Sequence, residues 1–158
     1  MRPYEVFASR FGAKVAFNSQ FILEKSQRYY LLNPRLKKVG QEDFFYAGLY
    51  LGKVGKNGGF FPSFNLLNML VDVAANKIVV DQKAAWLFIC GRDVFRTGIV
   101  KVMGSNHKND AALVLNEFGE CLGFGMIMES LNGSEGKVAV KNVLDVGDFL
   151  RRETTEKF

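Results

Sequence analysis

The segment from Asp81 to Val102 constrains the fold of this chain more than any other segment, because it contains one residue suited to start a helix and another suited to end it. Asp81 can accept hydrogen bonds from the unpaired N–H groups of a following helical turn. Gly91 can close that helix in a left-handed conformation, which glycine adopts more easily than other residues. A short turn then leads to an apolar strand that starts at Gly98. The segment therefore predicts a short helix, a glycine-bearing exit and a strand.

Short strands with glycines at their turns follow this unit. The apolar runs of strand length span residues 111–115, 122–128 and 137–140. Residues 146–152 have the pattern of a last helical turn. We place a domain boundary near Ala75, so we expect two domains, residues 1–75 and 76–158.

The sequence of the first domain predicts short helices and antiparallel strands. Three aromatic or β-branched runs are typical of an antiparallel meander, and they span residues 14–17, 21–24 and 28–32. Asn33 can cap a helix whose first residue is Pro34, and Ser63 begins another with apolar residues at three- and four-residue spacing. Helices are expected over residues 3–12, 34–40 and 63–74, and a longer strand over residues 45–54.

The composition is that of a folded protein with a hydrophobic core. Of the 158 residues, 48% are hydrophobic, and no apolar run reaches the roughly 18 residues that a membrane helix needs. The N-terminus lacks the apolar stretch of a secretory signal, so we expect a cytoplasmic protein without a membrane contact. Cys90, Cys121 and the single His107 stand at no metal-ligand spacing, so we expect reduced thiols, no metal and no cofactor.

The net charge of +5 mildly favours a polyanionic partner such as nucleic acid. Residues 1–75 carry ten Lys and Arg against five Asp and Glu, whereas residues 76–158 carry eleven of each. If the second domain binds RNA, it must therefore use a local patch. The basic residues Arg28, Arg35, Lys37 and Lys38 of the first domain are either a second RNA contact or, as is commoner, a solvated helix face.

The C-terminal basic residues Arg151, Arg152 and Lys157 are the first candidates for an RNA contact. Two guanidinium groups and one ammonium group can bind phosphates, and arginine also stacks on unpaired bases. The alternative is that these cations only complement the dipole at a helix C-terminus. The neighbouring Glu153 weakens the patch.

Other candidate groups favour structural roles. His107 lies near Asp110 with no nucleophile at a recognisable spacing, so a surface histidine is the better interpretation. Gly123-Phe124-Gly125 lacks the helix start and third glycine of a phosphate loop and favours packing inside a barrel. Trp86-Leu87-Phe88 favours the core over a base-stacking platform. The sequence shows no paired carboxylates and no nucleophile elbow, so we expect no enzyme.

Two motifs in combination carry a resemblance to a known family. They are Leu122-Gly123-Phe124-Gly125 and the Asp-x-Gly-x-Phe-x-Arg pattern of residues 145–151. With them, the chain resembles the Nip-seven family of ribosome biogenesis factors over roughly Tyr29 to Glu153. The resemblance implies an α+β fold, in which an N-terminal antiparallel α/β (pre-PUA) domain precedes a C-terminal PUA pseudobarrel. An N-terminus shorter than that of eukaryotic members favours an archaeal homologue.

The resemblance also implies a function. It implies a non-catalytic RNA-binding factor in large ribosomal subunit biogenesis and rRNA processing, with a preference for uridine-rich single strands. The implied partners are rRNA, pre-ribosomal particles and exosome subunits. PUA domains usually bind RNA at the edge between their first helix and the next strand, which implies contacts for Arg92 and, less strongly, for Arg96. Turn chemistry at Gly91 and Gly98 is the alternative there.

Two further functions stay open on the sequence alone. PUA domains are often attached to RNA-modifying enzymes, so the chain could be an accessory protein of RNA modification. It could also be a protein-interaction module of the exosome or pre-ribosome, whose surface would lie on the first domain. The aromatic residues considered for that surface are Phe44, Phe45, Tyr46 and Tyr50.

Overall fold

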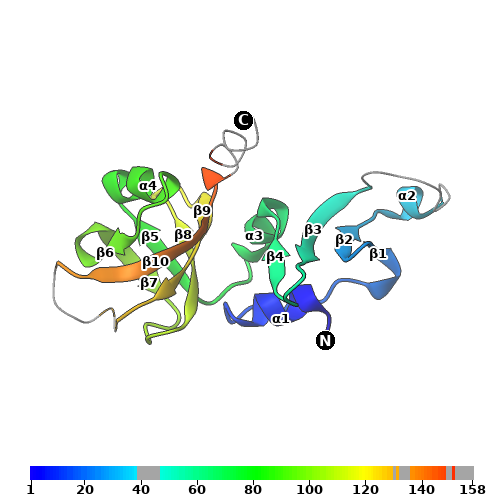
Figure 1. The fold of residues 1–158 in the computed structure, drawn as a ribbon, viewed down its shortest axis with the longest axis horizontal. Coiled ribbons are helices and arrows are strands. Elements are labelled where there is room, and N and C mark those ends of the chain that lie inside the picture. Colours follow the sequence, from blue (N-terminus) through cyan, green and yellow to red (C-terminus); the bar gives the residue numbers. More distant parts are fainter. Residues whose placement is uncertain (39–46, 130, 132–135, 149–150, 152–158) are drawn as a thin grey trace. The chain divides into compact units, whose positions relative to one another are not determined.

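The computed structural model describes residues 1–38, 47–129, 131, 136–148 and 151 (Figure 1). The chain forms two compact units. The N-terminal unit contains residues 1–9 and 13–73, and the C-terminal unit contains residues 10–12 and 74–158. No helix among the described residues is long and apolar enough to cross a bilayer.

The N-terminal unit is an antiparallel sheet with short helices. The strand order is β1-β2-β3-β4, and α1 and α3 pack against this sheet. The strands are β1 (Ile22–Lys25), β2 (Arg28–Leu31), β3 (Leu49–Val54) and β4 (Phe60–Pro62), and the helices are α1 (Pro3–Ser9), η1 (Ser19–Phe21), α2 (Pro34–Lys38) and α3 (Phe64–Leu70). Phe7 of α1, Leu51 of β3 and Leu67 of α3 are buried in its core.

The helix starts of this unit follow the predicted capping chemistry. Asn33 and Ser63 each accept a hydrogen bond from the backbone N–H three residues on, which confirms both predicted starts. The helix that Ser63 caps, α3, ends at Leu70 rather than at the predicted Ala74. The N–H of Val71 bonds to the carbonyl three residues back, and this tighter turn ends the α-helix.

The strands of this unit are shorter than predicted. Residues 14–17 form no strand, so the meander begins with the β1–β2 hairpin, whose turn residues Ser26 and Gln27 have φ of 50° and 62°. The strand expected over residues 45–54 begins at Leu49. The chain then returns as β4, a short strand that was not predicted. The predicted end of α2 near residue 40 and the aromatic residues Phe44, Phe45 and Tyr46 lie outside the described residues.

The C-terminal unit is a curled six-stranded sheet with the helix α4 packed on it (Figure 1). The strand order is β6-β10-β9-β8-β5-β7, with β5 parallel to β8 and the other pairs antiparallel. Its elements are β5 (Lys77–Val80), α4 (Gln82–Ile89), β6 (Val94–Phe95), η2 (Arg96–Gly98), β7 (Ile99–Met103), β8 (Ala111–Leu115), β9 (Cys121–Ile127) and β10 (Val138–Asp145). The mixed α+β class is therefore confirmed.

Most predicted elements of this unit are present with shifted bounds. The helix after Asp81 and the strand at residues 111–115 are found as predicted. The strand expected from Gly98 starts one residue later at Ile99, because Gly98 closes the 3-10 turn η2. β10 is twice the predicted length, and β5 was not predicted. Of the expected last helical turn, residues 148 and 151 are helical among those described.

Close packing of β9 against β10 explains one glycine motif. Gly123 has φ of 145°, and a Cβ there would overlap the Leu144 carbonyl. A Cβ on Gly125 would meet the Lys141 carbonyl at 2.5 Å. These glycines let two neighbouring backbones approach, which confirms packing over phosphate binding.

A short N-terminal segment completes the C-terminal unit. Phe11 is fully buried, and its ring meets that of Phe124 edge-on with centroids 5.5 Å apart. The Phe11 carbonyl accepts hydrogen bonds from the N–H groups of Ala75 and Asn76, each at 3.0 Å. Residues 10–12 thus belong to the core of the second unit although the chain continues from them into the first.

Candidate nucleic-acid interface

The start of α4 is fixed by Asp81. Its Oδ1 accepts a hydrogen bond from the Ala84 N–H at 2.7 Å, and its own N–H donates to the Gly98 carbonyl at 2.9 Å. A Cβ on Gly98 would meet the Ala84 Cβ at 2.5 Å, so the chain passes close to the first turn of the helix. Asp81 thereby ties α4 to the turn η2 that follows β6.

The exit of α4 is a Schellman motif. Gly91 has φ of 87°, as predicted, and its N–H donates to the Phe88 carbonyl at 2.9 Å. The N–H of Arg92 donates to the Leu87 carbonyl at 3.0 Å. Arg92 therefore leaves the helix in a defined direction, with its side chain exposed.

Two side chains from distant parts of the chain hold this exit. Asn142 of β10 donates from Nδ2 to the Phe88 carbonyl at 2.8 Å, and its backbone N–H donates to Asp93 Oδ1 at 2.8 Å. Arg151 donates from Nη1 to the Ile89 carbonyl at 2.8 Å. The last carbonyls of a helix have no partner one turn further on. Arg151 supplies a donor to the Ile89 carbonyl, and Asn142 adds a second donor to the Phe88 carbonyl, which already accepts the N–H of Gly91.

The Asp-x-Gly-x-Phe-x-Arg motif is explained by the same contact. Arg151 Nη2 donates to Asp145 Oδ2 at 2.7 Å, where the Asp145 side chain is 3% exposed and the Arg151 side chain 43%. The hydrogen bond that Arg151 donates to Asp145 is the main cause that raises the pKa of the Arg151 guanidinium. A Cβ on Gly147 would overlap the Ile89 carbonyl. The motif thus packs the segment after β10 onto the end of α4.

The predicted basic residues fall into two groups. Arg92 and Arg96 flank β6 on the helix–strand edge, Arg92 exposed and Arg96 half-buried, together with Gly91 and Gly98. Arg151 reaches the same helix exit from the C-terminal side. The predicted contacts Arg152 and Lys157 lie outside the described residues.

A pocket of about 320 Å³ lies on this edge, between α4 and the turn η2. We call it the helix-edge pocket. It is lined by Asp81, Lys83, Ala84, Leu87, Asp93, Phe95, Thr97 and Gly98. Lys83 contributes a cation, and Leu87 and Phe95 contribute apolar surface. Neither Lys83 nor Phe95 was predicted as a site residue.

The apolar residues of α4 correct one prediction. Phe88 is fully buried as predicted, but Trp86 is 65% exposed and Leu87 38% exposed, so the core assignment was wrong for both. Ala84 and Ala85 pack with Phe88 against the sheet. The helical period then turns residues 86 and 87 outward. Phe95 is 48% exposed because Val94, beside it on a strand, points into the core.

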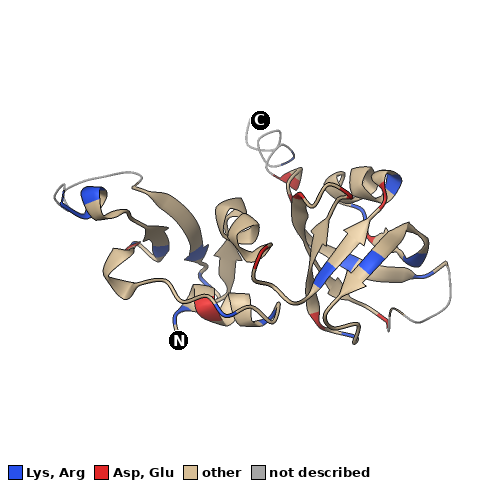
Figure 2. Ribbon diagram, turned by 180° about the vertical axis from the view of Figure 1, so that it is seen from behind, with Lys and Arg blue, Asp and Glu red and all other residues tan. Residues whose placement is uncertain are grey.

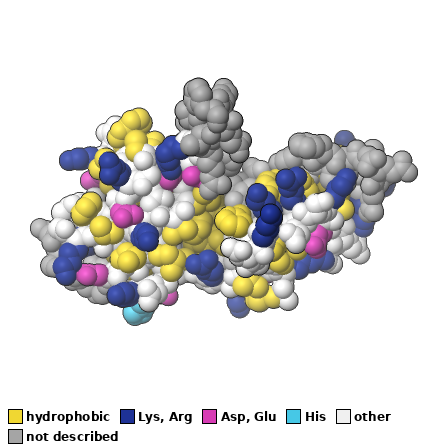
Figure 3. Space-filling model, viewed as in Figure 1, with side chains coloured by type: hydrophobic (Ala, Val, Ile, Leu, Met, Phe, Trp, Pro, Cys, Tyr) yellow, Lys and Arg dark blue, Asp and Glu magenta, His cyan; other side chains and the backbone are white. Residues whose placement is uncertain are grey.

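The charge of the C-terminal unit is dispersed. Lys and Arg lie on strands of the six-stranded sheet as well as on α4 and in loops (Figure 2). On the face in Figure 3, basic and acidic side chains of this unit are interspersed rather than gathered. A nucleic-acid contact would therefore depend on local groups at the helix–strand edge.

His107 belongs to a turn network. Its Nδ1 lies 3.1 Å from the Ser105 hydroxyl, which donates its hydrogen bond to Asp110. A carboxylate that binds the serine rather than the imidazole does not match a nucleophile–base–orienter relay. His107 is exposed, so the surface interpretation is confirmed. No three His, Cys, Asp or Glu side chains within the described ranges are grouped to hold a metal ion.

Sequence comparison now assigns the family. Residues 76–154 match the family described as the UPF0113 PUA domain. A UPF0113 protein from Archaeoglobus fulgidus is 31% identical over 136 residues, which cover 84% of this chain and 76% of the relative. The chain belongs to the UPF0113 PUA domain family. The resemblance to the Nip-seven family is confirmed as well, since this PUA protein matches a relative that carries that name.

That relative is a 60S ribosome subunit biogenesis protein NIP7 homolog from Tetraodon nigroviridis. It is 24% identical over 140 residues, covering 84% of the PUA protein described here and 78% of the relative. The solved structure of a conserved PUA domain protein from Thermoplasma acidophilum aligns with a TM-score of 0.62 at 22% identity, over 94% of this chain and 90% of that one. This likeness confirms the predicted fold with its PUA pseudobarrel.

Proposed function

We propose that this PUA protein is a non-catalytic RNA-binding factor that acts in assembly of the large ribosomal subunit and in rRNA processing. The observation that carries the proposal is the match of nearly the whole chain to a protein named for 60S subunit biogenesis. The helix–strand edge of the PUA unit supports it, because Lys83 and exposed apolar surface line a pocket there, and Arg92 and Arg96 are sequence neighbours of the lining residues Asp93, Phe95 and Thr97.

The edge suits an unpaired RNA strand. The Gly98 backbone lines the helix-edge pocket, and its missing side chain leaves room for Ala84 of α4 in the same lining. Arg92 and Lys83 are exposed cations for phosphates. Phe95 and Trp86 offer exposed rings on which bases can stack.

We propose two roles for Arg151. It positions the exit of α4 through the Ile89 carbonyl, and its exposed surface extends the cationic edge toward the RNA. Arg152 and Lys157 are proposed as further phosphate contacts on the same segment. Because Arg151 is also bound to Asp145, an effect of replacing it has a structural part that must be measured separately.

The finer parts of the proposal come from family resemblance. We propose a preference for uridine-rich single strands, association with pre-ribosomal particles and exosome subunits, and a cytoplasmic location. We further propose that residues 76–158 are the RNA-binding domain and that residues 1–75 form a pre-PUA domain. The helical cations Arg35, Lys37 and Lys38 are exposed on α2, as a solvated helix face requires.

A binding titration tests the proposed edge. We expect Arg92→Ala with Arg96→Ala to weaken binding of a labelled uridine-rich RNA in fluorescence anisotropy. The slope of log K against log salt should become shallower by about 0.7 for each phosphate that the variant no longer neutralises. The matched control is Lys101→Ala with Lys56→Ala, which removes two exposed cations from other surfaces. If affinity and slope match those of the control, the edge is not the RNA site.

A second titration tests the C-terminal residues. Arg152→Ala alone, and Arg151→Ala with Arg152→Ala, should both weaken binding. A thermal melt of each variant separates a weaker interaction with RNA from a loosened α4 exit. Incubation of the protein with rRNA, followed by mass spectrometry, tests the non-catalytic assignment. Any turnover of base or backbone would contradict it.

A further inference from the structure

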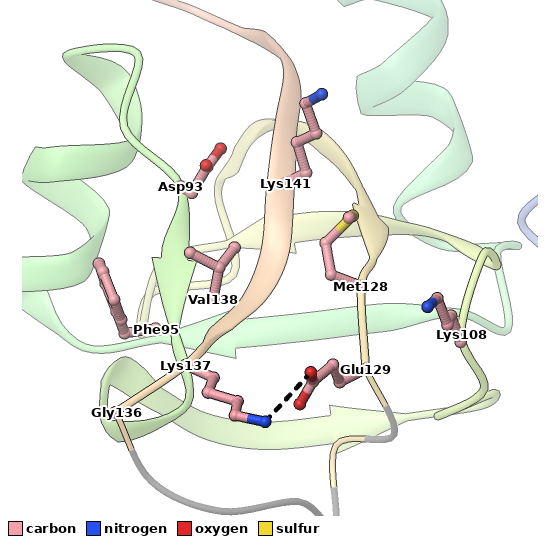
Figure 4. A pocket seen from close by; sticks show the side chains of 9 residues that line it. All are labelled: Asp93, Phe95, Lys108, Met128, Glu129, Gly136, Lys137, Val138 and Lys141. Carbon is pink, nitrogen blue, oxygen red and sulfur yellow. Dashed lines mark ion pairs between the residues drawn. The ribbon is translucent and has the colours of Figure 1, made fainter.

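A second pocket shares Asp93 and Phe95 with the helix-edge pocket, and its lining is drawn in Figure 4. We call it the sheet-edge pocket. Its volume is about 590 Å³, which is in the range of pockets that hold small ligands. It is lined by Asp93, Phe95, Lys108, Met128, Glu129, Gly136, Lys137, Val138 and Lys141. Neither the family match nor the proposed edge assigns a ligand to it.

The polar groups of this pocket leave it cationic. Lys137 forms an ion pair with Glu129 at 3.5 Å, so these two charges offset each other. Asp93 accepts the backbone N–H of a β10 residue and keeps its negative charge, so the lining holds three ammonium groups against two carboxylates. Lys108 and Lys141 are exposed, and neither makes an ion pair with any described carboxylate. Two ammonium groups are thus available for an anionic ligand.

The sheet-edge pocket also has apolar side chains in its lining, beside the charged ones. Phe95 lies at one end of the lining and Lys108 at the other, with Met128 and Lys137 between them (Figure 4). Phe95 is 48% exposed, and Val138 is its cross-strand partner. A ligand with an anionic group and a flat apolar group matches this order of side chains. A nucleotide has both.

Phe95 and Asp93 connect the two pockets, because both residues line each of them, and Phe95 supplies the ring. The helix-edge pocket reaches it from α4 and η2, and the sheet-edge pocket reaches it from β10 and the loop that carries Lys108. A strand that occupies the first pocket therefore meets the second as soon as it passes the ring. Single-strand binding sites have this construction, with an aromatic ring inside a cationic groove.

We propose that the RNA strand continues over Phe95 into the sheet-edge pocket, where Lys108 and Lys141 neutralise its phosphates and a base packs on Phe95. The inference rests on the proposed function and adds a second half to its binding site. RNA is favoured over an acidic peptide because the ring is shared with the helix-edge pocket, where a nucleotide is already proposed.

Charge reversal tests the proposal on the full chain. We expect Lys108→Glu with Lys141→Glu to lower affinity for a uridine-rich RNA of about twelve nucleotides by at least about tenfold. The control, Lys56→Glu with Lys101→Glu, changes the net charge equally on exposed residues outside both pockets. We expect a small loss of affinity for the control. A thermal melt confirms that both variants are folded.

Fluorescence tests the ring directly. Trp86 is the only tryptophan, so Trp86→Phe with Phe95→Trp moves the signal into the wall shared by the pockets. We expect RNA to quench that tryptophan, and we expect Lys108→Glu with Lys141→Glu to shift the quenching to higher RNA concentration. Phe95→Ala should lower affinity by about fivefold or more, as for loss of one stacked base.

The outcomes separate this inference from the proposed function. Lysine variants that bind like their control, while Arg92→Ala with Arg96→Ala weakens binding, would overturn the sheet-edge pocket alone. Weakening by the lysine variants only would support the pocket and overturn the helix edge. A wild-type protein that binds no RNA would overturn both. Quenching of the relocated tryptophan by poly-glutamate but not by RNA would show a peptide site and overturn the inference.

Discussion

Asn142 offers a quantitative test of how the RNA-facing edge is held. Its Nδ2 donates to the Phe88 carbonyl at 2.8 Å, and the same carbonyl also accepts the N–H of Gly91. Asn142→Ala therefore removes one short hydrogen bond from an acceptor that keeps another, and also the long one of 3.4 Å from the same Nδ2 to the Arg92 carbonyl. A single hydrogen bond contributes about 1 kcal/mol net, so we expect the free energy of unfolding of the C-terminal unit to fall by about 1 kcal/mol.

Asn142→Asp should cost more, although its shape is nearly the same. The carboxylate has no donor for the Phe88 carbonyl, it lies at the negative end of α4, and Asp93 is hydrogen-bonded to the backbone of the same residue. We expect a loss of about 2 to 3 kcal/mol at pH 7. The new carboxyl should have a raised pKa in the folded protein. The penalty should then shrink as pH falls through that pKa, because the protonated group can donate again.

Thermal melts followed by circular dichroism measure these losses, because a loss of 1 kcal/mol lowers the melting temperature of a unit of this size by about 4–8 °C. Hydrogen exchange at the Arg92 amide, which bonds to the Leu87 carbonyl, reports loosening of the exit itself. Asn57→Asp, in the exposed turn after β3, adds the same charge as a control. Equal stability of Asn142→Ala and Asn142→Asp at pH 7 would refute the charge argument. Wild-type stability of both would show that the amide does not hold the helix.

Two further predictions concern other parts of the C-terminal unit. Burial raises the pKa of the Cys121 thiol to about 11, so at pH 8 only about one thiol in a thousand is ionised. We expect a thiol reagent to label exposed Cys90 rapidly and Cys121 only slowly, with a Cys90→Ser variant to assign the slow phase, and two equally fast thiols would contradict the burial. Because the unfolded thiol ionises at lower pH, stability should also fall as pH rises from about 8.5 towards 11. Gly123→Ala should destabilise by about 3 kcal/mol or more in a denaturant titration, since its Cβ overlaps the Leu144 carbonyl at a positive φ. Gly119→Ala, with φ of 81° and open space around it, should cost only the strain of about 1 kcal/mol, and similar losses at the two sites would show that the close approach is not limiting.

Elements whose ends depend on contacts between residues close in the sequence could be predicted from the sequence. Asp81 and Gly91 bound α4 through contacts with residues three or four positions away, so their chemistry predicts the helix without knowledge of the fold. β5 was missed because its four residues are a strand through a parallel pairing with β8, more than thirty residues on. Trp86 was misplaced because the inward side of α4 is decided by the sheet beneath it, which selects the small Ala84 and Ala85.

The candidate site was predictable only in part for the same reason. Arg92 was singled out by the family resemblance, which implies an RNA contact just after the first helix of a PUA domain. Phe95 and Lys141 become neighbours only when β6 pairs with β10, and no local pattern joins them. The role of Arg151 at α4 depends on a carbonyl sixty-two positions earlier. The motif of residues 145–151 carried the family resemblance, but it did not predict the contact between Asp145 and Arg151 or what that contact holds.

The position of Phe11 has a consequence for synthesis and for truncation. During translation this ring leaves the ribosome long before Phe124, the aromatic partner that it needs, so the core of the second unit stays open at that point until most of the chain has been made. A protein cut between residues 75 and 76 would lose the ring together with the Phe11 carbonyl, which accepts the backbone N–H of Asn76. Excision of the PUA unit as a stable fragment therefore requires residues 10–12 to be supplied, either by a circular permutation or as a separate peptide.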